Sequence, residues 1–306
     1  MYPPVVLLGG LALLLGGLAT MRLGLKKLFS PVFRRLLAKL TLSPWRGFLV
    51  GAVGAALAQS STMIILMTIG LVNGEYLSFY QGLGIVLGAN VGTCSTVGLL
   101  SLAPPLQCVL AILPVSVAIA ALSVRLRPVA LAIAGMFAMF SGVGFLAEGL
   151  AAVSQLEIII RWLTSAGQNP LAGIGGGILL TFLFQSSSAA TALLMVLASE
   201  GAIDLTAAAY GMYGNNIGSC LSSLLVGAGA ALAARRVAVA HVVLNIAGVI
   251  LFLPATGLLT TAATSIAADF GVQVAVMHTL FNLVSSLVAL PLCRPLARLI
   301  VFFVPR

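Results

Sequence analysis

The sequence is poor in charge. Charged side chains make up 7% of the 306 residues, and six Asp and Glu face fifteen Lys and Arg. A soluble domain usually carries about a quarter charged residues. With 61% hydrophobic residues and a mean hydropathy of +1.19, the chain falls outside the soluble class. We therefore expect an all-α polytopic membrane protein, with the lipid bilayer as its main surroundings.

The sequence also lacks the residue groups that most enzymes use. It has no metal-ligand cluster, no zinc-protease helix motif and no carboxylate pair within an apolar stretch. We therefore expect no enzymatic activity, no organic cofactor and no metal other than a transported ion. The four cysteines (Cys94, Cys108, Cys220 and Cys293) show no ligand spacing and are expected to pack as small residues. The two histidines each precede an asparagine by four residues, at His241 and His278, which is typical of a bond to a neighbouring helix.

The basic residues indicate orientation rather than nucleic-acid binding. Fourteen of the fifteen fall in clusters that flank apolar stretches. These clusters are Arg22 to Arg46, Arg125 with Arg127, Arg235 with Arg236, and Arg294 with Arg298 and Arg306; only Arg161 stands apart. Because cytoplasmic loops collect Lys and Arg, we expect the clusters to lie on the inner side of the membrane, with 22–46 along the inner leaflet.

Two parts of the sequence are similar at a constant shift. Gln59-Ser60-Ser61-Thr62 matches Gln185-Ser186-Ser187-Ser188, a shift of 185 − 59 = 126 residues. The same shift carries Gly88–Cys94 onto Gly214–Cys220. We therefore predict one transmembrane transport domain over 1–306, with a first repeat at 5–124, a second at 130–250, and C-terminal helices at 251–306.

The apolar stretches divide into complete spans and shorter halves. The expected elements are spans at 3–21, 77–101, 103–124, 128–150, 205–228, 237–254 and 272–292, an amphipathic stretch at 22–43, a connector at 151–168, and broken pairs at 45–73 and 171–199. A spanning helix needs roughly 20 apolar residues, and the halves 47–58 and 62–72 are too short. We interpret each broken pair as a re-entrant hairpin.

This layout predicts that the two repeats have opposite orientations. With 22–46 cytoplasmic and both hairpins returning to their own side, fourteen basic residues lie inside. The predicted outer residues are Arg161, Glu148, Glu157, Glu200, Asp204 and Asp269, with Glu75 inside. The N-terminus is then outside the cell membrane and the C-terminus in the cytoplasm. Inverted repeats with broken helices are typical of secondary transporters.

The hairpin tips can bind an anion and a cation together. A helix N-terminus with serine hydroxyls binds anions, and the carbonyl end of the other half-helix suits a cation. Asn90, Thr93, Asn216 and Ser219 lie in glycine-flanked stretches of partly unwound helix and can add neutral oxygen ligands. Because no Lys or Arg falls near either tip, co-bound cations would neutralise the anion. Sodium is favoured over protons because the tips lack Asp and Glu.

At these residues the sequence resembles the type II sodium/phosphate cotransporter family, which carries a Gln-Ser-Ser-Ser motif in each of two inverted repeats. The resemblance implies a sodium-dependent phosphate symporter that works by alternating access. It implies a phosphate site at Gln59, Ser60, Ser61, Thr62, Gln185, Ser186, Ser187 and Ser188. It implies sodium ligands at Gln59, Ser60, Asn90, Thr93, Gln185, Ser186, Asn216 and Ser219.

The sequence departs from the family pattern at two places. Thr62 replaces the third serine of the first motif, and 115–119 lack the His-x-x-x-Asn segment that often follows each repeat. We expect the bare transport unit, without a soluble regulatory domain. The residues leave open another oxyanion or a dicarboxylate as cargo, and a phosphate sensor or scaffold that does not transport. They also leave the oligomeric state open, with a homodimer as one option.

Overall fold

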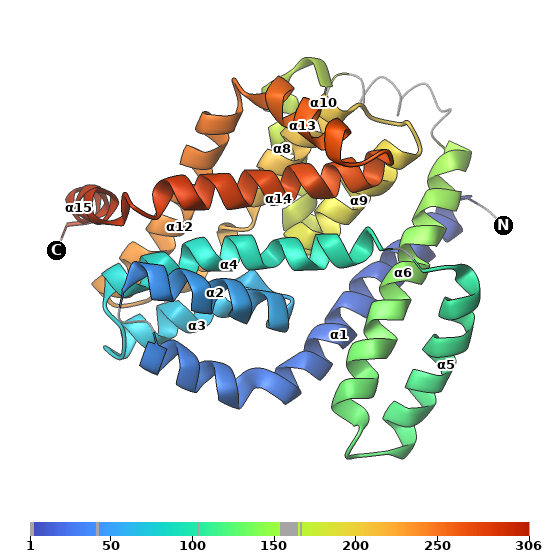
Figure 1. The fold of residues 1–306 in the computed structure, drawn as a ribbon, viewed down its shortest axis with the longest axis horizontal. Helices are drawn as coiled ribbons and strands as arrows, with labels where there is room; N and C mark the ends of the chain where they lie inside the picture. The colour runs from blue at the N-terminus through green and yellow to red at the C-terminus, as the bar shows by residue number, and fades with distance from the viewer. Residues whose placement is uncertain (1–2, 41–42, 103, 154–164, 166, 306) are drawn as a thin grey trace. The chain divides into compact units, whose positions relative to one another are not determined.

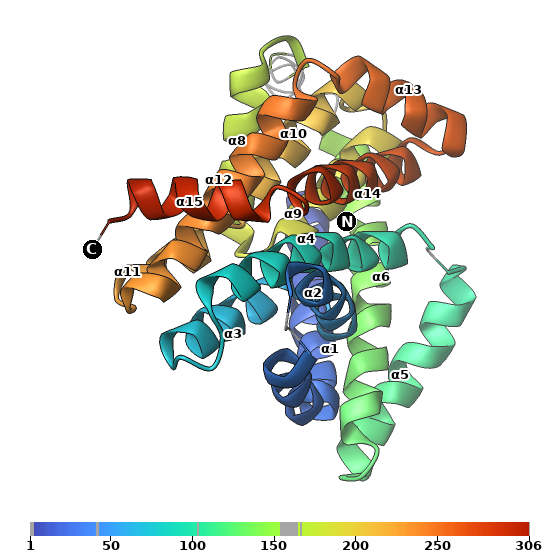
Figure 2. The same ribbon diagram turned by 60° about the vertical axis from the view of Figure 1, so that its left-hand side comes forward.

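The computed structural model describes residues 3–40, 43–102, 104–153, 165 and 167–305, and these contain helices and turns without a β-strand. The helices are α1 (Pro3–Leu40), α2 (Pro44–Ala58), α3 (Ser61–Asn73), α4 (Phe79–Leu100), α5 (Leu106–Leu122), α6 (Arg127–Val153), α8 (Pro170–Phe184), α9 (Ser187–Ser199), α10 (Leu205–Gly218), α11 (Leu221–Ala228), α12 (Leu232–Phe252), α13 (Thr256–Ile266), α14 (Phe270–Ala289) and α15 (Cys293–Phe303). Figures 1 and 2 show their course. The expected all-helical fold is confirmed. Arg161, Glu157 and most of the connector 151–168 lie outside the described residues.

Among the residues that the structure describes, five helices are long and apolar enough to cross a membrane. They are Pro3–Leu28, Phe79–Leu100, Arg127–Leu150, Leu232–Phe252 and Phe270–Ala289. Four shorter apolar helices of 10 to 17 residues accompany them, and three of these belong to the two broken pairs. The chain is therefore a multi-pass membrane protein.

The chain divides into two compact units, each built from segments of both sequence repeats. Unit 1 contains residues 1–30, 97–215 and 260–277. Within it, α5 packs along α6, as Figures 1 and 2 show. The first part of α1 approaches the backbone of α6 closely, since a Cβ at Gly10 would lie 2.8 Å from Leu146 N and one at Gly17 would lie 2.6 Å from Met139 N. Small residues at such contacts are the usual way membrane helices pack closely.

Unit 2 contains residues 31–96, 216–259 and 278–306. Within it, α2 lies against α4 across several glycines, and α3 packs on α11 and α12. The C-terminal helix α15 contacts α12, where Arg236 Nε donates to Val304 O at 3.0 Å.

The structure corrects two predictions about the helices. The first span and the amphipathic stretch form one helix, α1, because the change in polarity near Arg22 does not interrupt the backbone. The helix α4 is continuous, so the predicted unwinding over Gly88–Thr93 is wrong. Its glycines serve packing instead, since a Cβ at Gly88 would collide with Phe48 O. The helices α13 and α15 lie within the C-terminal helices predicted at 251–306, but no bounds were predicted for them, because their apolar stretches are too short to suggest spans.

Candidate functional site

The first broken pair is interrupted by two residues, Gln59 and Ser60. Gln59 has left-handed backbone angles, φ 51° and ψ 33°, and ends α2. The Gln59 N–H donates to Ala56 O at 3.3 Å, and the Ser60 N–H donates to Ala55 O at 3.1 Å. This pair of hydrogen bonds is the Schellman motif. Ser60 then caps α3, its hydroxyl oxygen accepting from Met63 N at 3.2 Å. The two-residue break therefore joins two helices that contact each other.

The second broken pair has the same local geometry. Gln185 ends α8 with φ 50° and ψ 26°, and Ser186 caps α9 by accepting from Ala189 N at 3.3 Å. Both glutamines turn their side chains back, because Gln59 Nε2 donates to Ala56 O and Gln185 Nε2 to Phe182 O, each at 2.6 Å. The two motifs related by the 126-residue shift thus fold alike locally.

The positions of positive φ support this equivalence. Within the described chain they are Gln59, Glu75, Gln185 and Gly201. These form two pairs, since 185 − 59 = 126 and 201 − 75 = 126. Left-handed backbone is uncommon outside glycine, so the coincidence indicates that both segments adopt the same sequence of turns.

Each tip offers hydrogen-bond donors at a helix N-terminus. In the described residues the N–H groups of Ser61, Thr62, Ser187 and Ser188 make no hydrogen bond, as expected for the first turn of a helix. The hydroxyls of Ser60 and Ser186 accept a backbone N–H, so their own protons remain available to donate. With the positive end of the helix dipole, these groups can bind an oxyanion without a basic side chain.

A serine that the sequence did not single out contacts the first tip. Ser95, on α4, accepts from Gln59 Nε2 at 3.0 Å and donates to Gly92 O at 2.8 Å. Gln59 is 6% exposed, so the bond is nearly shielded from solvent. The predicted ligand Thr93 points its hydroxyl at Ala89 O, at 3.0 Å, within its own helix. The interval of 36 residues between Gln59 and Ser95 gives no periodic signal, so sequence reasoning missed Ser95.

The remaining predicted ligands of unit 2 lie on α4 and beside the α10–α11 break. Asn90 Nδ2 donates to Asn245 Oδ1 of α12 at 3.4 Å. Ser219 donates to Asn216 O at 2.7 Å, and Cys220 N to Ile217 O at 3.0 Å. In the second repeat the helix is regular through Gly218 and is interrupted at Ser219 and Cys220, between α10 and α11, at the C-terminal end of the stretch that was predicted to unwind.

The second hairpin is joined to α10 by a buried polar cluster in unit 1. The Asn215 amide, oriented with its nitrogen toward Gly177 O at 2.9 Å and Thr181 Oγ1 at 3.2 Å, accepts from Thr191 N at 3.2 Å. At the equivalent positions the first repeat has only apolar residues: Ala55, Ile65 and Ala89. These polar residues were also missed. A comparison of the repeats for positions that are polar in one copy only would have found them.

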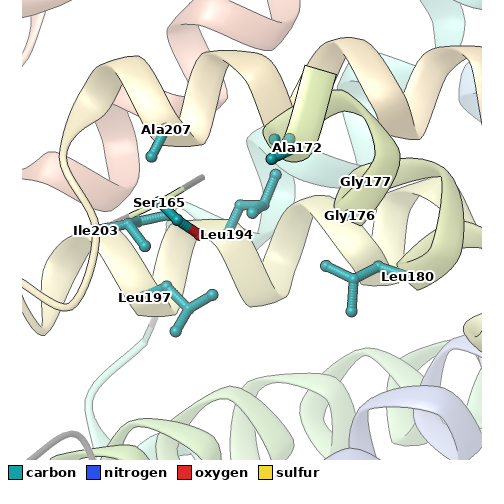
Figure 3. Close-up of a pocket in the computed structure, with 11 residues that line it drawn as sticks. Ser165, Ala172, Gly176, Gly177, Leu180, Leu194, Leu197, Ile203 and Ala207 are labelled. Carbon is teal, nitrogen blue, oxygen red and sulfur yellow. The ribbon is translucent and has the colours of Figure 1, made fainter. Parts of the chain in front are cut away.

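A small cavity of about 50 Å³ lies between α8, α9 and α10 (Figure 3). Glycines and aliphatic side chains dominate its lining, including Gly177, Leu194, Leu197 and Gly211. The predicted site residues are absent from this lining. An apolar cavity of this size suits helix packing rather than an ion.

The predicted site residues fall into two groups. Gln59, Ser60, Ser61, Thr62, Asn90, Thr93, Asn216 and Ser219 belong to unit 2, whereas Gln185, Ser186, Ser187 and Ser188 belong to unit 1. Both groups contain buried residues: Gln59 and Thr93 are each 6% exposed and Asn216 7% in unit 2, whereas Ser186 is 8% and Ser188 3% exposed in unit 1. Gln185 is exposed.

The sequence matches the model of a known protein family. The family model described as Na+/Pi-cotransporter matches the chain twice, over residues 13–155 and 141–282. The chain belongs to the Na+/Pi-cotransporter family. The two matches each contain one hairpin tip, so the two motifs found at a constant shift fall one in each copy of the family model.

Relatives extend across bacteria and mammals. A Bacillus subtilis protein, "Uncharacterized protein YqeW", is 28% identical over 98% of this chain and 99% of its own length. The Escherichia coli "Putative inorganic phosphate export protein YjbB" is 26% identical over 95% of this chain, which spans 54% of that relative. The rabbit "Sodium-dependent phosphate transport protein 2A" is 34% identical over 34% of this chain and 18% of its own length. No solved structure matches the chain.

Proposed function

We propose that this protein is a sodium-dependent carrier of inorganic phosphate. The main support is the pair of matching tips, each with serine hydroxyls and free backbone N–H groups at a helix N-terminus, in a chain of the Na+/Pi-cotransporter family. In our proposal the two hairpins are re-entrant and enter from opposite sides, and the serine hydroxyls and N–H groups of both tips take part in phosphate binding.

Charge balance favours sodium as the co-transported ion. Each helix N-terminus contributes about half a positive charge, which is too little for a phosphate carrying one to two negative charges. The nearest basic residues in the sequence are Arg46 and Arg125 for the first tip and Arg161 and Arg235 for the second. Sodium held by neutral oxygens of Gln59, Ser60, Asn90, Asn216 and Ser219, with Gln185 and Ser186, would supply the missing charge.

The direction of transport has two candidates. The rabbit relative is named for sodium-dependent phosphate transport, whereas the E. coli relative is named for phosphate export. The sum of the sodium and phosphate gradients determines the direction of net transport by a symporter, so one binding site is compatible with uptake or export. A sodium gradient directed inward would drive uptake in our proposal.

The decisive experiment is uptake of labelled phosphate into proteoliposomes. We expect uptake with an inward sodium gradient and little with potassium, and we expect sulfate and dicarboxylates to compete weakly. Uptake that does not depend on sodium, or binding without flux, would overturn the proposal. Loading the vesicles with phosphate and reversing the sodium gradient tests export.

The tips themselves are tested by Ser60→Ala and Ser186→Ala. Both serines cap a helix, and loss of a cap alone costs about 1 kcal/mol. Ser43→Ala is the matched control, because Ser43 caps α2 at its other end by accepting from Arg46 N at 3.4 Å. We expect phosphate uptake to fall in the two tip variants and to persist in the control. Equal loss in all three would point to stability rather than binding.

A further inference from the structure

Asn245 lies in a buried hydrogen-bond network that reaches a predicted sodium ligand. It is on α12, in unit 2, and is 3% exposed. Its amide nitrogen donates to His241 O at 2.9 Å, one turn earlier, and to Cys220 Sγ at 3.3 Å. The asparagine of the His241-x-x-x-Asn245 motif therefore bonds both to its own helix and to Cys220.

These contacts determine which way the Asn245 amide points. A backbone carbonyl can only accept, so the atom facing His241 O must be the NH2 group. Its Oδ1 then faces Asn90, on α4, at 3.4 Å from Asn90 Nδ2. Because Oδ1 can only accept, Asn90 must present its own NH2 group there.

The orientation of Asn90 follows from the same rule. With Nδ2 directed at Asn245, Asn90 Oδ1 is the other end of the amide and makes no hydrogen bond within the described part of the chain. A carbonyl oxygen held in this way is a suitable ligand for a hard cation. Without Asn245 the Asn90 amide could turn its NH2 group toward the cation and repel it.

The other His-x-x-x-Asn motif provides an internal comparison. On α14, Asn282 Nδ2 donates to His278 O at 2.9 Å, as Asn245 does to His241 O. Cys94 donates to His278 O at 3.8 Å and Cys220 to His241 O at 3.5 Å, and the two cysteines are again 126 residues apart. The two networks are alike, but only Asn245 is bonded to a predicted sodium ligand among the described residues.

We propose that Asn245 is a positioning residue that fixes the Asn90 carbonyl oxygen toward a bound sodium ion. The inference rests on the proposed function and adds a residue that acts on sodium affinity through Asn90. Outer partners of this kind typically change cation affinity by about tenfold or more when they are removed.

The test is a double-mutant cycle in proteoliposomes. Initial rates of phosphate uptake are measured against sodium concentration for wild type, Asn245→Leu, Asn90→Ala, the double variant and Asn282→Leu. We expect Asn245→Leu to raise the half-saturating sodium concentration about tenfold with little change in the maximal rate. In the Asn90→Ala background it should add nothing, because its effect passes through Asn90. Asn282→Leu should leave sodium dependence unchanged.

Other outcomes overturn the inference. Additive effects of Asn245→Leu and Asn90→Ala, an equal shift in Asn282→Leu, or an unchanged half-saturating concentration would each do so. If Asn245→Leu fails to insert, Asn245→Ser replaces it, since a serine can bond back to the preceding turn as Ser285 does to Phe281 O at 2.5 Å. Uptake by the wild-type chain that is independent of sodium would instead overturn the proposed function.

Discussion

Gln59 and Ser95 are joined by a hydrogen bond of 3.0 Å between Nε2 and Oγ, which connects the first hairpin tip to α4. The second repeat has Leu221 at the position equivalent to Ser95, since 95 + 126 = 221. The exposed Gln185 therefore lacks an equivalent serine in its own repeat. The two tips share a backbone conformation, but only the Gln59 side chain has a serine hydroxyl of the following helix in its own repeat as a hydrogen-bond partner.

Replacing Ser95 by alanine should weaken ion binding at the first tip. The variant removes a bond that holds Gln59, and a single hydrogen bond contributes about 1 kcal/mol. We expect phosphate uptake at subsaturating sodium to fall about fivefold. Ser101→Ala is the control, because Ser101 follows the last residue of α4 and its hydroxyl donates to Gly98 O of the preceding turn at 2.7 Å. Similar losses in both variants would contradict the prediction.

Gln185 allows its backbone and side-chain roles to be separated. At φ 50° glutamine and alanine carry the same backbone strain of about 1 kcal/mol, because both have a Cβ, whereas glycine does not. We expect Gln185→Ala to leave the thermal unfolding midpoint in detergent near that of wild type and Gln185→Gly to raise it. If the side chain binds sodium, phosphate uptake falls in both. Normal uptake by Gln185→Gly would remove this side chain from the site.

Glu75 occupies a turn position that favours glycine. Its φ is 62°, and its N–H bonds to Val72 O at 3.2 Å in the same pattern as Gly201 N to Ala198 O at 3.0 Å. We expect Glu75→Gly to raise the free energy of unfolding by up to about 1 kcal/mol, and Gly201→Ala to lower it by a similar amount. A Cβ at Gly201 meets no atom within 4 Å, so the loss is conformational. Denaturation in detergent measures both changes, and a gain from Gly201→Ala would refute the assignment.

Gly88 and Gly98 on α4 should respond oppositely to alanine. A Cβ at Gly88 collides with Phe48 O of α2, whereas one at Gly98 meets no atom within 4 Å. We expect Gly88→Ala to destabilise the protein by about 1–3 kcal/mol and Gly98→Ala to be neutral or stabilising by up to about 1 kcal/mol. Thermal unfolding of the purified variants distinguishes them. A tolerated Gly88→Ala would mean that α2 and α4 pack less closely than the structure indicates.

The sequence alone predicted the elements that depend on local properties. The length and hydropathy of an apolar stretch determine whether it can span a bilayer, so most spans and both broken pairs could be located. The breaks at Gln59-Ser60 and Gln185-Ser186 were predicted because a polar motif lies between apolar halves that are too short to span a bilayer, and because the two motifs recur at a constant shift. The predicted unwinding failed in α4, since glycine permits a break without requiring one.

Only the tertiary structure decided which polar groups meet. Asn90 and Asn245 are 155 residues apart, and Gln59 and Ser95 are on different helices. The polar cluster around Asn215 likewise joins three helices. Hydropathy and helical periodicity determine which face of a helix is apolar, but they do not determine which helix packs against that face. The hydrogen bonds of the candidate site depend on that packing, because a buried amide can bond only to polar groups of the helices that pack beside it.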